Sequence, residues 1–139
     1  MIFIDSNIVI DVLSNDPTWK PWSETQLDAG VDRGGLVIDV IVVGELGRGF
    51  STLAELIDTM GRMFLEIAPL DVSVSFEAGR RFLQYRRDRT AQDRPRVLPD
   101  FFIGAHALTL GIPLLTRDPR LYRRYFPELT LITPETDHD

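Results

Sequence analysis

Short apolar runs rich in β-branched residues alternate with segments of helical periodicity along the whole chain. The apolar runs are Ile2–Ile4, Leu36–Ile38, Leu65–Ala68, Ile112–Thr116 and Leu129–Thr133. Continuous runs of this kind are typical of strands that are covered on both faces. Strands that alternate with helices pair in parallel, because each helix returns the chain to the same edge of the sheet. The pattern predicts an α/β fold, a three-layer α/β/α sandwich with a central, mostly parallel sheet of about five strands.

Segments with apolar residues at helical spacing lie between the expected strands. They are Ile8–Leu13, Trp19–Arg33, Asp39–Arg48, Ser51–Phe64, Val72–Arg87, Pro99–Leu110 and Pro119–Tyr125. The polar, weakly patterned stretch 87–96 predicts a loop. No repeat or internal boundary interrupts the alternation, and 139 residues suffice to bury the core of one domain, so residues 1–139 are interpreted as a single domain.

Composition removes several classes of protein from consideration. The chain has no cysteine, which excludes disulfides, thiolate metal sites and a cysteine nucleophile. Its formal net charge of −6 argues against a general nucleic-acid coat, because such proteins are usually basic, but not against a nuclease whose acids bind metal. The first strand is expected to begin at Ile2, which leaves no room for the charged and apolar regions of a signal peptide. No apolar run approaches the ~20 residues needed to cross a bilayer. We therefore expect a cytoplasmic protein with no membrane contact.

Four acidic residues stand beside apolar runs, where solvated surface charge is not expected. They are Asp5, Glu45, Asp100 and Asp118. Carboxylates are rarely buried without a partner, and several brought together repel one another unless protons or cations neutralise them. In parallel sheets the ligand site lies beyond the carboxyl ends of the strands. Sparse carboxylates, with waters and substrate phosphates, are the usual ligands of Mg²⁺. The pattern predicts a metal-dependent site that cleaves phosphodiesters.

Three of these acids also have a structural explanation, which the sequence leaves open. Asp5 could cap the helix that follows it, and Asp118 could cap the helix whose first residue is proline. Asp100 lies in a first helical turn, where the helix dipole favours a negative charge. A catalytic and a structural role are thus both compatible with each acid taken alone.

Glu45 is harder to explain as a structural residue. It lies in an apolar helix between Gly44 and Gly47, and both glycines lower helix propensity without an obvious gain in packing. Glycine at these positions would let a ligand or another backbone segment come close. This makes Glu45 the acid whose sequence context most favours a functional role.

The other polar residues predict structural roles. Expected helix caps are Asp39 and Asp71, and acids expected to be solvated are Asp11, Asp16 and Asp28. His106 lies on a largely apolar helix and is interpreted as a packed residue. With two histidines in the chain, a Ser-His-Asp hydrolase or a two-histidine ribonuclease is not expected, and Ser6 has no evident base to make it a nucleophile.

The segments that carry the four acids resemble those of the PIN-domain ribonucleases, and within that family the VapC-type toxins of bacterial toxin–antitoxin pairs. The resembling segments are Ile2-Phe3-Ile4-Asp5-Ser6-Asn7, Val42-Val43-Gly44-Glu45-Leu46, Leu98-Pro99-Asp100-Phe101-Phe102-Ile103-Gly104-Ala105-His106-Ala107, Leu114-Leu115-Thr116-Arg117-Asp118-Pro119 and Tyr122-Arg123-Arg124-Tyr125-Phe126-Pro127. Each segment is short, but their order and spacing cover essentially the whole chain.

The resemblance implies a role for each matching residue. Asp5, Asp100 and Asp118 would coordinate Mg²⁺ or Mn²⁺, directly or through water, with Glu45 assisting. The polar residues expected to orient the carboxylates or contact the scissile phosphate are Asn7, Thr116 and Ser6. The reaction would be endoribonucleolytic hydrolysis by water, which leaves 5′-phosphate and 3′-hydroxyl ends.

The resemblance also implies partners besides RNA. These are a cognate antitoxin that covers the acidic cleft and a second copy of the chain in a homodimer. Trp19 and Trp22 could anchor the antitoxin or pack in the core. Arginines gather in the segment 80–96 and again in 117–124, where they could meet RNA phosphates, antitoxin carboxylates or solvent.

Other readings of the motifs are less favoured. A haloacid dehalogenase-type phosphatase needs a second aspartate two residues after the first, where this chain has Asn7. A dinucleotide-binding fold needs a glycine-rich turn after the first strand, and none is present. A structure-specific DNA nuclease and a non-catalytic RNA- or protein-binding PIN-like module remain as alternatives.

Overall fold

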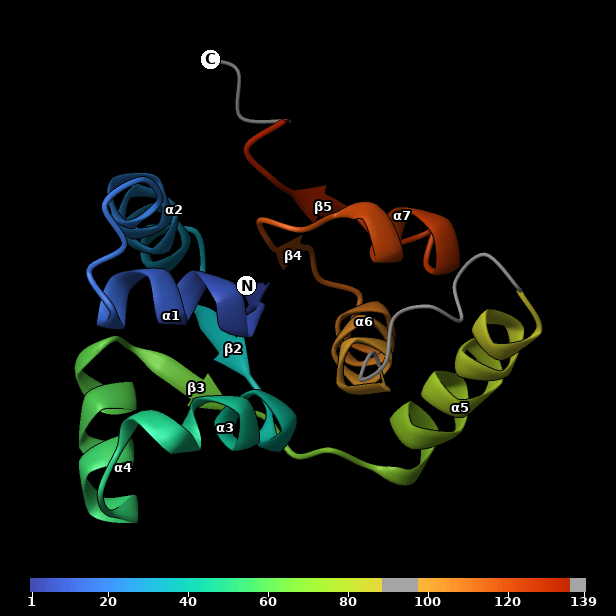
Figure 1. Cartoon of the computed structure of the whole chain (residues 1–139), viewed down its shortest axis with the longest axis horizontal. Helices are drawn as coiled ribbons and strands as arrows, with labels where there is room; N and C mark the ends of the chain where they lie inside the picture. Colours follow the sequence, from blue (N-terminus) through green and yellow to red (C-terminus); the bar gives the residue numbers. More distant parts are fainter. Residues whose placement is uncertain (89–97, 136–139) are drawn as a thin grey trace.

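Five parallel strands form the central sheet of the computed structural model, which describes residues 1–88 and 98–135 (Figure 1). The strands are β1 (Ile2–Ile4), β2 (Leu36–Ile38), β3 (Leu65–Ile67), β4 (Leu114–Leu115) and β5 (Leu131–Ile132). Their order across the sheet is β3-β2-β1-β4-β5, and every neighbouring pair is parallel. The predicted α/β sandwich is confirmed, and its sheet is wholly rather than mostly parallel.

The helices fall where the apolar periodicity predicts them, with ends that differ by a few residues. They are α1 (Ser6–Leu13), α2 (Lys20–Asp32), α3 (Val40–Leu46), α4 (Leu53–Arg62), α5 (Val72–Arg87), α6 (Leu98–Leu110) and α7 (Arg120–Tyr125). The largest difference is at α4, which is two residues shorter at each end than the predicted segment Ser51–Phe64. The helix α3 ends at Leu46 because the glycine-containing segment Gly47–Gly49 tightens into a 3₁₀ turn. Most of the loop expected at 87–96 lies outside the described residues.

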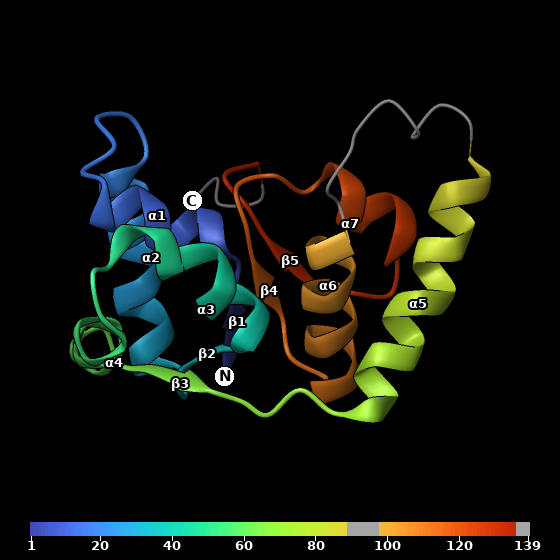
Figure 2. The ribbon, with the colours of Figure 1, turned by 60° about the horizontal axis from the view of Figure 1, so that its bottom comes forward.

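Helices cover both faces of the sheet. In Figure 2, α1 to α4 lie to the left of β4 and β5, and α5 to α7 lie to their right. Right-handed crossovers require this division, because the chain moves from β1 to β3 in one direction and then returns to β4 and β5 in the other. The strands β1 and β4 are therefore covered on both faces, and Phe3, Ile4 and Leu114 are fully buried.

The direction in which strands are added to the sheet reverses between β1 and β4. In open α/β sheets the carboxyl ends of the strands at such a reversal are the usual ligand site. The amide of Asp5 donates to the carbonyl of Leu115 at 3.0 Å, so the ends of β1 and β4 lie side by side. In Figure 2, α1, α7 and the first turn of α6 lie toward the same end of the molecule. The segments that carry Asp5, Asp100 and Asp118 thus meet at one end of the sheet.

No helix in residues 1–88 or 98–135 is long and apolar enough to span a membrane.

Candidate active site

Asp5 is the most buried of the four acids and has the most hydrogen-bond partners. It caps α1 through its Oδ1, which accepts from the amide of Ser6 at 2.8 Å. Its Oδ2 accepts from the hydroxyl groups of Thr116 at 2.8 Å and Tyr122 at 3.0 Å. Burial raises the pKa of Asp5 above its usual range, although these hydrogen bonds lower it. The cap interpretation of Asp5 is correct, but it accounts for only one of the two carboxylate oxygens.

Thr116 links the ends of β1 and β4 through its hydroxyl. Besides donating to Asp5, its Oγ1 accepts from the amide of Asp118 at 3.1 Å and from the side-chain amide of Asn7 at 3.3 Å. The Oδ1 of Asn7 accepts from the amide of Arg117 at 3.3 Å. The structure thus joins two of the three expected orienting residues, Asn7 and Thr116, to the acids at this edge.

Asp100 lies in the first turn of α6, and each of the other three acids raises its pKa. Burial, followed by the charges of Asp5, Glu45 and Asp118 in that order, raises the pKa of Asp100 to about 7. Burial also raises the pKa of Glu45, followed by the charge of Asp5, while a hydrogen bond from Ser6 opposes the rise. The four predicted acids are therefore close enough to form one electrostatic unit.

Asp118 is exposed and does not cap a helix. The residue at the N-cap position of α7 is Pro119, and no side chain caps that helix. The structural explanation for Asp118 is therefore wrong, since its carboxylate does not cap α7. Its backbone is fixed by the amide that donates to Thr116.

Glu45 supplies a test of whether the site fits a cation. Its Oε1 is buried and has no hydrogen-bond partner among the described residues. A buried carboxylate oxygen left unpaired is costly, and a cation or an ion-bound water would satisfy it. Around it, a Cβ added at Gly44 or Gly47 would meet no described atom within 4 Å, so the side of α3 near these glycines is open.

The acids do not form a closed cage. Within the described part of the chain, no three Asp, Glu or His side chains are close enough to hold an ion directly. Mutual repulsion separates carboxylates when no cation is between them. Mg²⁺ keeps several of its waters in protein sites, so a spread set of oxygen ligands fits a hydrated ion. We conclude that the residues present fit Mg²⁺ or Mn²⁺ held largely through water.

A buried pair joins the two helices that carry Glu45 and Asp100. Asp39 caps α3 by accepting from the amides of Ile41 and Val42 at 2.9 and 3.0 Å. Its other oxygen accepts from Nδ1 of His106 on α6 at 2.8 Å. The predictions of Asp39 as a cap and His106 as a packed residue are both confirmed. Their direct bond, which fixes α3 against α6, has no signal in the sequence.

The expectation that Asp11 is solvated is wrong. Only 2% of its surface is exposed, and its carboxylate accepts from Nε and a terminal nitrogen of Arg117 at 2.5 and 2.7 Å. The hydroxyl of Ser23 also donates to Asp11, at 2.8 Å. The partner lies 106 residues further along the chain, so no local pattern could indicate it. Of the other two acids expected to be solvated, Asp28 is exposed and Asp16 is partly buried in the turn before α2.

Tyr122 is a site residue that the sequence did not single out. Its hydroxyl donates to Asp5, and its side chain is buried under α7. Burial raises its pKa well above 10, followed by the charge of Asp5, so it donates as a neutral phenol. The only signal for it was its place in the last of the resembling segments.

The expected antitoxin anchors are partly engaged within the chain. Trp19 and Trp22 pack edge to face with ring centroids 6.2 Å apart, and Trp19 also contacts the guanidinium of Arg117. A more open apolar surface lies beside Glu45. It is a groove of about 490 Å³ lined by Ile10, Leu13, Leu46, Phe50 and Arg48 among others.

The fold is an α/β/α sandwich, and the four interacting carboxylates lie where the strand order of the parallel sheet reverses. This arrangement defines an acidic site that fits a metal ion. The sequence profile of the PIN domain matches residues 2–127. This chain therefore belongs to the PIN domain family. A search of curated proteins found no match.

Solved structures share the whole fold at low sequence identity. A chain of VapBC2 from Rickettsia felis, bound to a DNA fragment from its promoter, is 20% identical with a TM-score of 0.72, over 96% of this chain and 98% of that one. A chain of a toxin–antitoxin complex from Klebsiella pneumoniae is 20% identical with a TM-score of 0.69, over 96% and 98%. VapC20 of Mycobacterium tuberculosis, a Sarcin-Ricin loop cleaving toxin, is 13% identical with a TM-score of 0.52, over 81% and 85%.

Proposed function

We propose that this chain is a VapC-type toxin, an endoribonuclease that depends on Mg²⁺ or Mn²⁺. The observation that carries the proposal is the electrostatic unit of Asp5, Glu45, Asp100 and Asp118, in which burial and the other carboxylates raise the pKa of Asp100 to about 7. Such a cluster is unfavourable without a cation. The toxin–antitoxin neighbours and the RNA-cleaving toxin among them support the same function.

The acids of the site and their neutral neighbours would have separate roles. Asp5, Asp100, Asp118 and the unpaired Oε1 of Glu45 would hold the metal. When bound, the metal supplies Lewis acidity for deprotonating a water and offsets the charge of the phosphate under attack. Thr116 and Tyr122 occupy Oδ2 of Asp5 and so fix the orientation of that carboxylate.

Hydrolysis needs a water, not the RNA 2′-hydroxyl, as the nucleophile. Attack by water breaks the bond from phosphorus to the 3′-oxygen, leaving a 5′-phosphate and a 3′-hydroxyl. Attack by the 2′-hydroxyl would leave a 2′,3′-cyclic phosphate. Asn7 donates to Thr116 beside the acids. Asn7 would contact the scissile phosphate, and the fully buried Thr116 would orient the carboxylate of Asp5.

The test is cleavage of total RNA with Mg²⁺, Mn²⁺ or EDTA, followed by mapping of the product ends. We expect cleavage only with metal, and 5′-phosphate ends. Asp5→Asn, Asp100→Asn and Asp118→Asn should each abolish it, and Glu45→Gln should reduce it. Asp28→Asn is a matched control, because Asp28 is an exposed acid outside the cluster. Undiminished cleavage by any two of the three aspartate variants would reject the assignment of the site.

We also propose an antitoxin that docks in the groove of Ile10, Leu13, Leu46 and Phe50. Its apolar side chains would fill the groove, and an Arg or Lys would reach the neighbouring acids. Co-purification of the chain with a small protein encoded beside it is the expected result. Leu13→Glu should disrupt that complex while leaving RNA cleavage intact. If the chain always purifies alone and its expression leaves growth unaffected, the toxin assignment fails even if the nuclease activity survives.

Self-association into a homodimer is the remaining part of the proposal. Apolar side chains along one side of α5 are exposed, with Val72 at 86% and Phe76 at 67%. Light scattering should give the mass of a dimer, and Phe76→Glu should shift it toward the monomer. A wild-type mass equal to that of one chain would contradict this part alone.

A further inference from the structure

Arg117 lies between Thr116 and Asp118, the two site residues that follow β4. Thr116 precedes it and donates to Asp5, and Asp118 follows it. Its own backbone amide donates to Oδ1 of Asn7 on α1 at 3.3 Å. Its side chain donates to both carboxylate oxygens of Asp11, also on α1, at 2.5 and 2.7 Å. Asn7 and Asp11 are four residues apart, so they present a single face of α1 to the segment 116–118.

The surroundings of Asp11 hold this contact in one geometry. The hydroxyl of Ser23 on α2 donates to the carboxylate at 2.8 Å. The guanidinium carbon of Arg117 lies 5.1 Å from the ring centroid of Trp19. A planar guanidinium that meets a buried carboxylate with two hydrogen bonds and stacks on an aromatic ring has little rotational freedom. The contact therefore fixes the orientation of Arg117 as well as its charge.

Because of this contact, the side chain of Arg117 is poorly placed to bind RNA phosphates or antitoxin carboxylates. Arg117 belongs to the arginine-rich segment 117–124, for which the sequence left such a role open. Both oxygens of Asp11 are already bonded to its guanidinium, and its side chain is only 25% exposed. Its remaining effect on the site passes through the backbone of Thr116 and Asp118.

We propose that Arg117 is a positioning residue for the acid cluster. By fastening the segment 116–118 to Asp11 of α1, it sets where the hydroxyl of Thr116 and the carboxylate of Asp118 lie relative to Asp5. The consequence for metal binding and RNA cleavage rests on the proposed function. The fastening itself does not, and it is open to a direct measurement.

The variant that tests the proposal changes both partners. Removing Arg117 alone leaves the charge of Asp11 buried and unpaired and endangers folding. The double variant Asp11→Asn/Arg117→Met avoids this, because the asparagine still accepts from Ser23 and the methionine keeps much of the volume beside Trp19. Arg117→Lys is a milder second variant that keeps the charge but cannot form the two parallel hydrogen bonds.

The first measurement is amide hydrogen exchange of the metal-free protein. The amides of Arg117 and Asp118 should exchange about tenfold faster in the double variant, because their acceptors Asn7 and Thr116 are no longer held in place. The amide of Thr116 donates to Ile132 within the sheet at 3.0 Å and should be unchanged. Unchanged exchange at Arg117 and Asp118 would overturn the proposal.

The second measurement is the affinity for Mn²⁺, by calorimetry. Loss of a residue that orients metal ligands typically weakens binding 10- to 100-fold, and we expect a value in that range for the double variant. RNA cleavage should lose kcat with little change in KM, and Arg117→Lys should recover part of the loss. Equal Mn²⁺ affinity in wild type and the double variant would contradict the proposal. A wild type that binds no Mn²⁺ would reject the proposed function, and the exchange result would still decide the role of Arg117.

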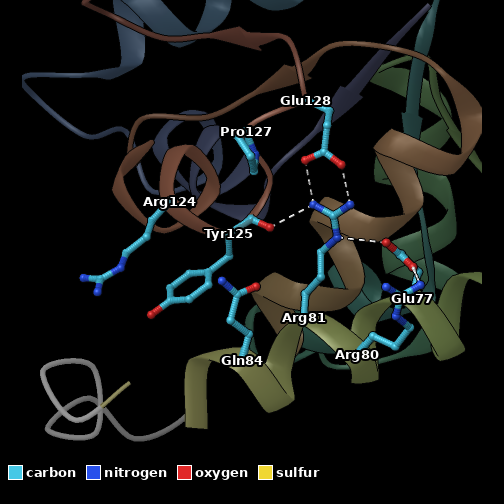
Figure 3. Close-up of a pocket in the computed structure, with 8 residues that line it drawn as sticks. All are labelled: Glu77, Arg80, Arg81, Gln84, Arg124, Tyr125, Pro127 and Glu128. Carbon is cyan, nitrogen blue, oxygen red and sulfur yellow. Dashed lines mark hydrogen bonds and ion pairs between the residues drawn. The ribbon is translucent and has the colours of Figure 1, made fainter. Parts of the chain in front are cut away.

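A matched control is available elsewhere in the chain. Arg81 makes the same kind of contact with Glu128, shown in Figure 3, and lies at 4.8 Å from the ring of Phe126. Arg81→Met/Glu128→Gln should lower stability without changing the Mn²⁺ affinity or the exchange of the Asp118 amide. A loss of Mn²⁺ affinity equal to that of the Asp11/Arg117 variant would show that the effect is general destabilisation, which would contradict the positioning role.

Discussion

Two arginines fasten distant segments of this chain with the same chemistry and different consequences. Arg117 joins the end of β4 to α1 through Asp11 and stacks on Trp19. Arg81 joins α5 to the segment after α7, since it donates to Glu77, to the carbonyl of Tyr125 and to Glu128, and it lies over Phe126 (Figure 3). Each guanidinium forms two hydrogen bonds with one carboxylate and one contact with an aromatic ring.

The difference lies in the carboxylates and in what adjoins them. Asp11 is buried, whereas the side chain of Glu128 is 54% exposed. The segment that Arg117 holds contains Thr116 and Asp118, whereas the segment that Arg81 holds contains no predicted site residue. We therefore expect the location of such a contact, more than its hydrogen-bond geometry, to determine whether it affects the acid cluster. Four predictions test this difference.

Removing one arginine at a time should give the largest contrast. Arg117→Ala leaves Asp11 buried and unpaired and should lower the free energy of unfolding by about 3–5 kcal/mol. Arg81→Ala leaves carboxylates that water can reach, so its cost should be about 1 kcal/mol. Urea denaturation of both variants gives the two values. Equal losses would show that the burial of Asp11 does not distinguish the two contacts.

The contributions of Asp100 and Glu128 to the free energy of unfolding should change with pH in opposite directions. The folded state raises the pKa of Asp100 from 3.8 to about 7, so it favours the proton and this contribution to stability is lost as pH rises through about 7. The effect is on the order of 4 kcal/mol. Glu128 has its pKa lowered from 4.5 to about 2 by Arg81, so its smaller contribution is present above pH 4.5 and is lost as pH falls toward 2.

The measurement is the free energy of unfolding of the metal-free protein across this pH range. Asp100→Asn should flatten the fall between pH 4 and 7, and Glu128→Gln should flatten the change below pH 4.5. The same slope in wild type and Asp100→Asn above pH 4.5 would remove Asp100 as its source.

Metal should stabilise the protein through one region only. Mn²⁺ at ~100 times its dissociation constant should add about 2.7 kcal/mol if it binds only the folded state. Arg81→Met/Glu128→Gln should gain the same amount at the same concentration, and Asp11→Asn/Arg117→Met should gain less. EDTA should abolish every gain. A melting temperature that does not change with Mn²⁺ in any variant would contradict the metal-binding site.

Salt should give the smallest contrast. Exposed ion pairs are screened by salt and buried pairs much less. The coupling energy of Arg81 with Glu128, from a double-mutant cycle, should fall by a few tenths of a kcal/mol between low and high NaCl. The coupling of Arg117 with Asp11 should stay constant. A fall of the same size in both cycles would mean that water reaches Asp11 as freely as Glu128.

Much of the fold could be predicted because its signals are local. The β-branched runs marked all five strands, and polar residues at helix starts marked caps such as Asp71, which accepts from the amide of Val74. The exact end of α3 was missed, since the tightening at Gly47–Gly49 depends on how the turn packs. Local patterns thus give elements and their order.

The acids of the site could be predicted from the sequence, but the residues that hold the acids in place could not. Carboxylates beside apolar runs are visible in the sequence because they conflict with their surroundings. The contacts from Tyr122 to Asp5, from His106 to Asp39 and from Arg117 to Asp11 join residues 117, 67 and 106 positions apart. Nothing near either partner distinguishes such a residue from an ordinary tyrosine, histidine or arginine. Tertiary structure was needed to find them.

The strand order described above also determines when the acid cluster can assemble during synthesis. β1 pairs with β2 early in the chain, but its other neighbour is β4, which begins at Leu114. Pairings between such distant residues form late, because a long loop must close before any contact rewards it. Asp5 is therefore translated first but receives its partners Thr116 and Tyr122 only from the last quarter of the chain. A ribosome-bound fragment that ends before β4 carries the first acid of the cluster without its hydrogen-bond partners, so the acid cluster is expected to assemble only after β4 and α7 have been synthesised.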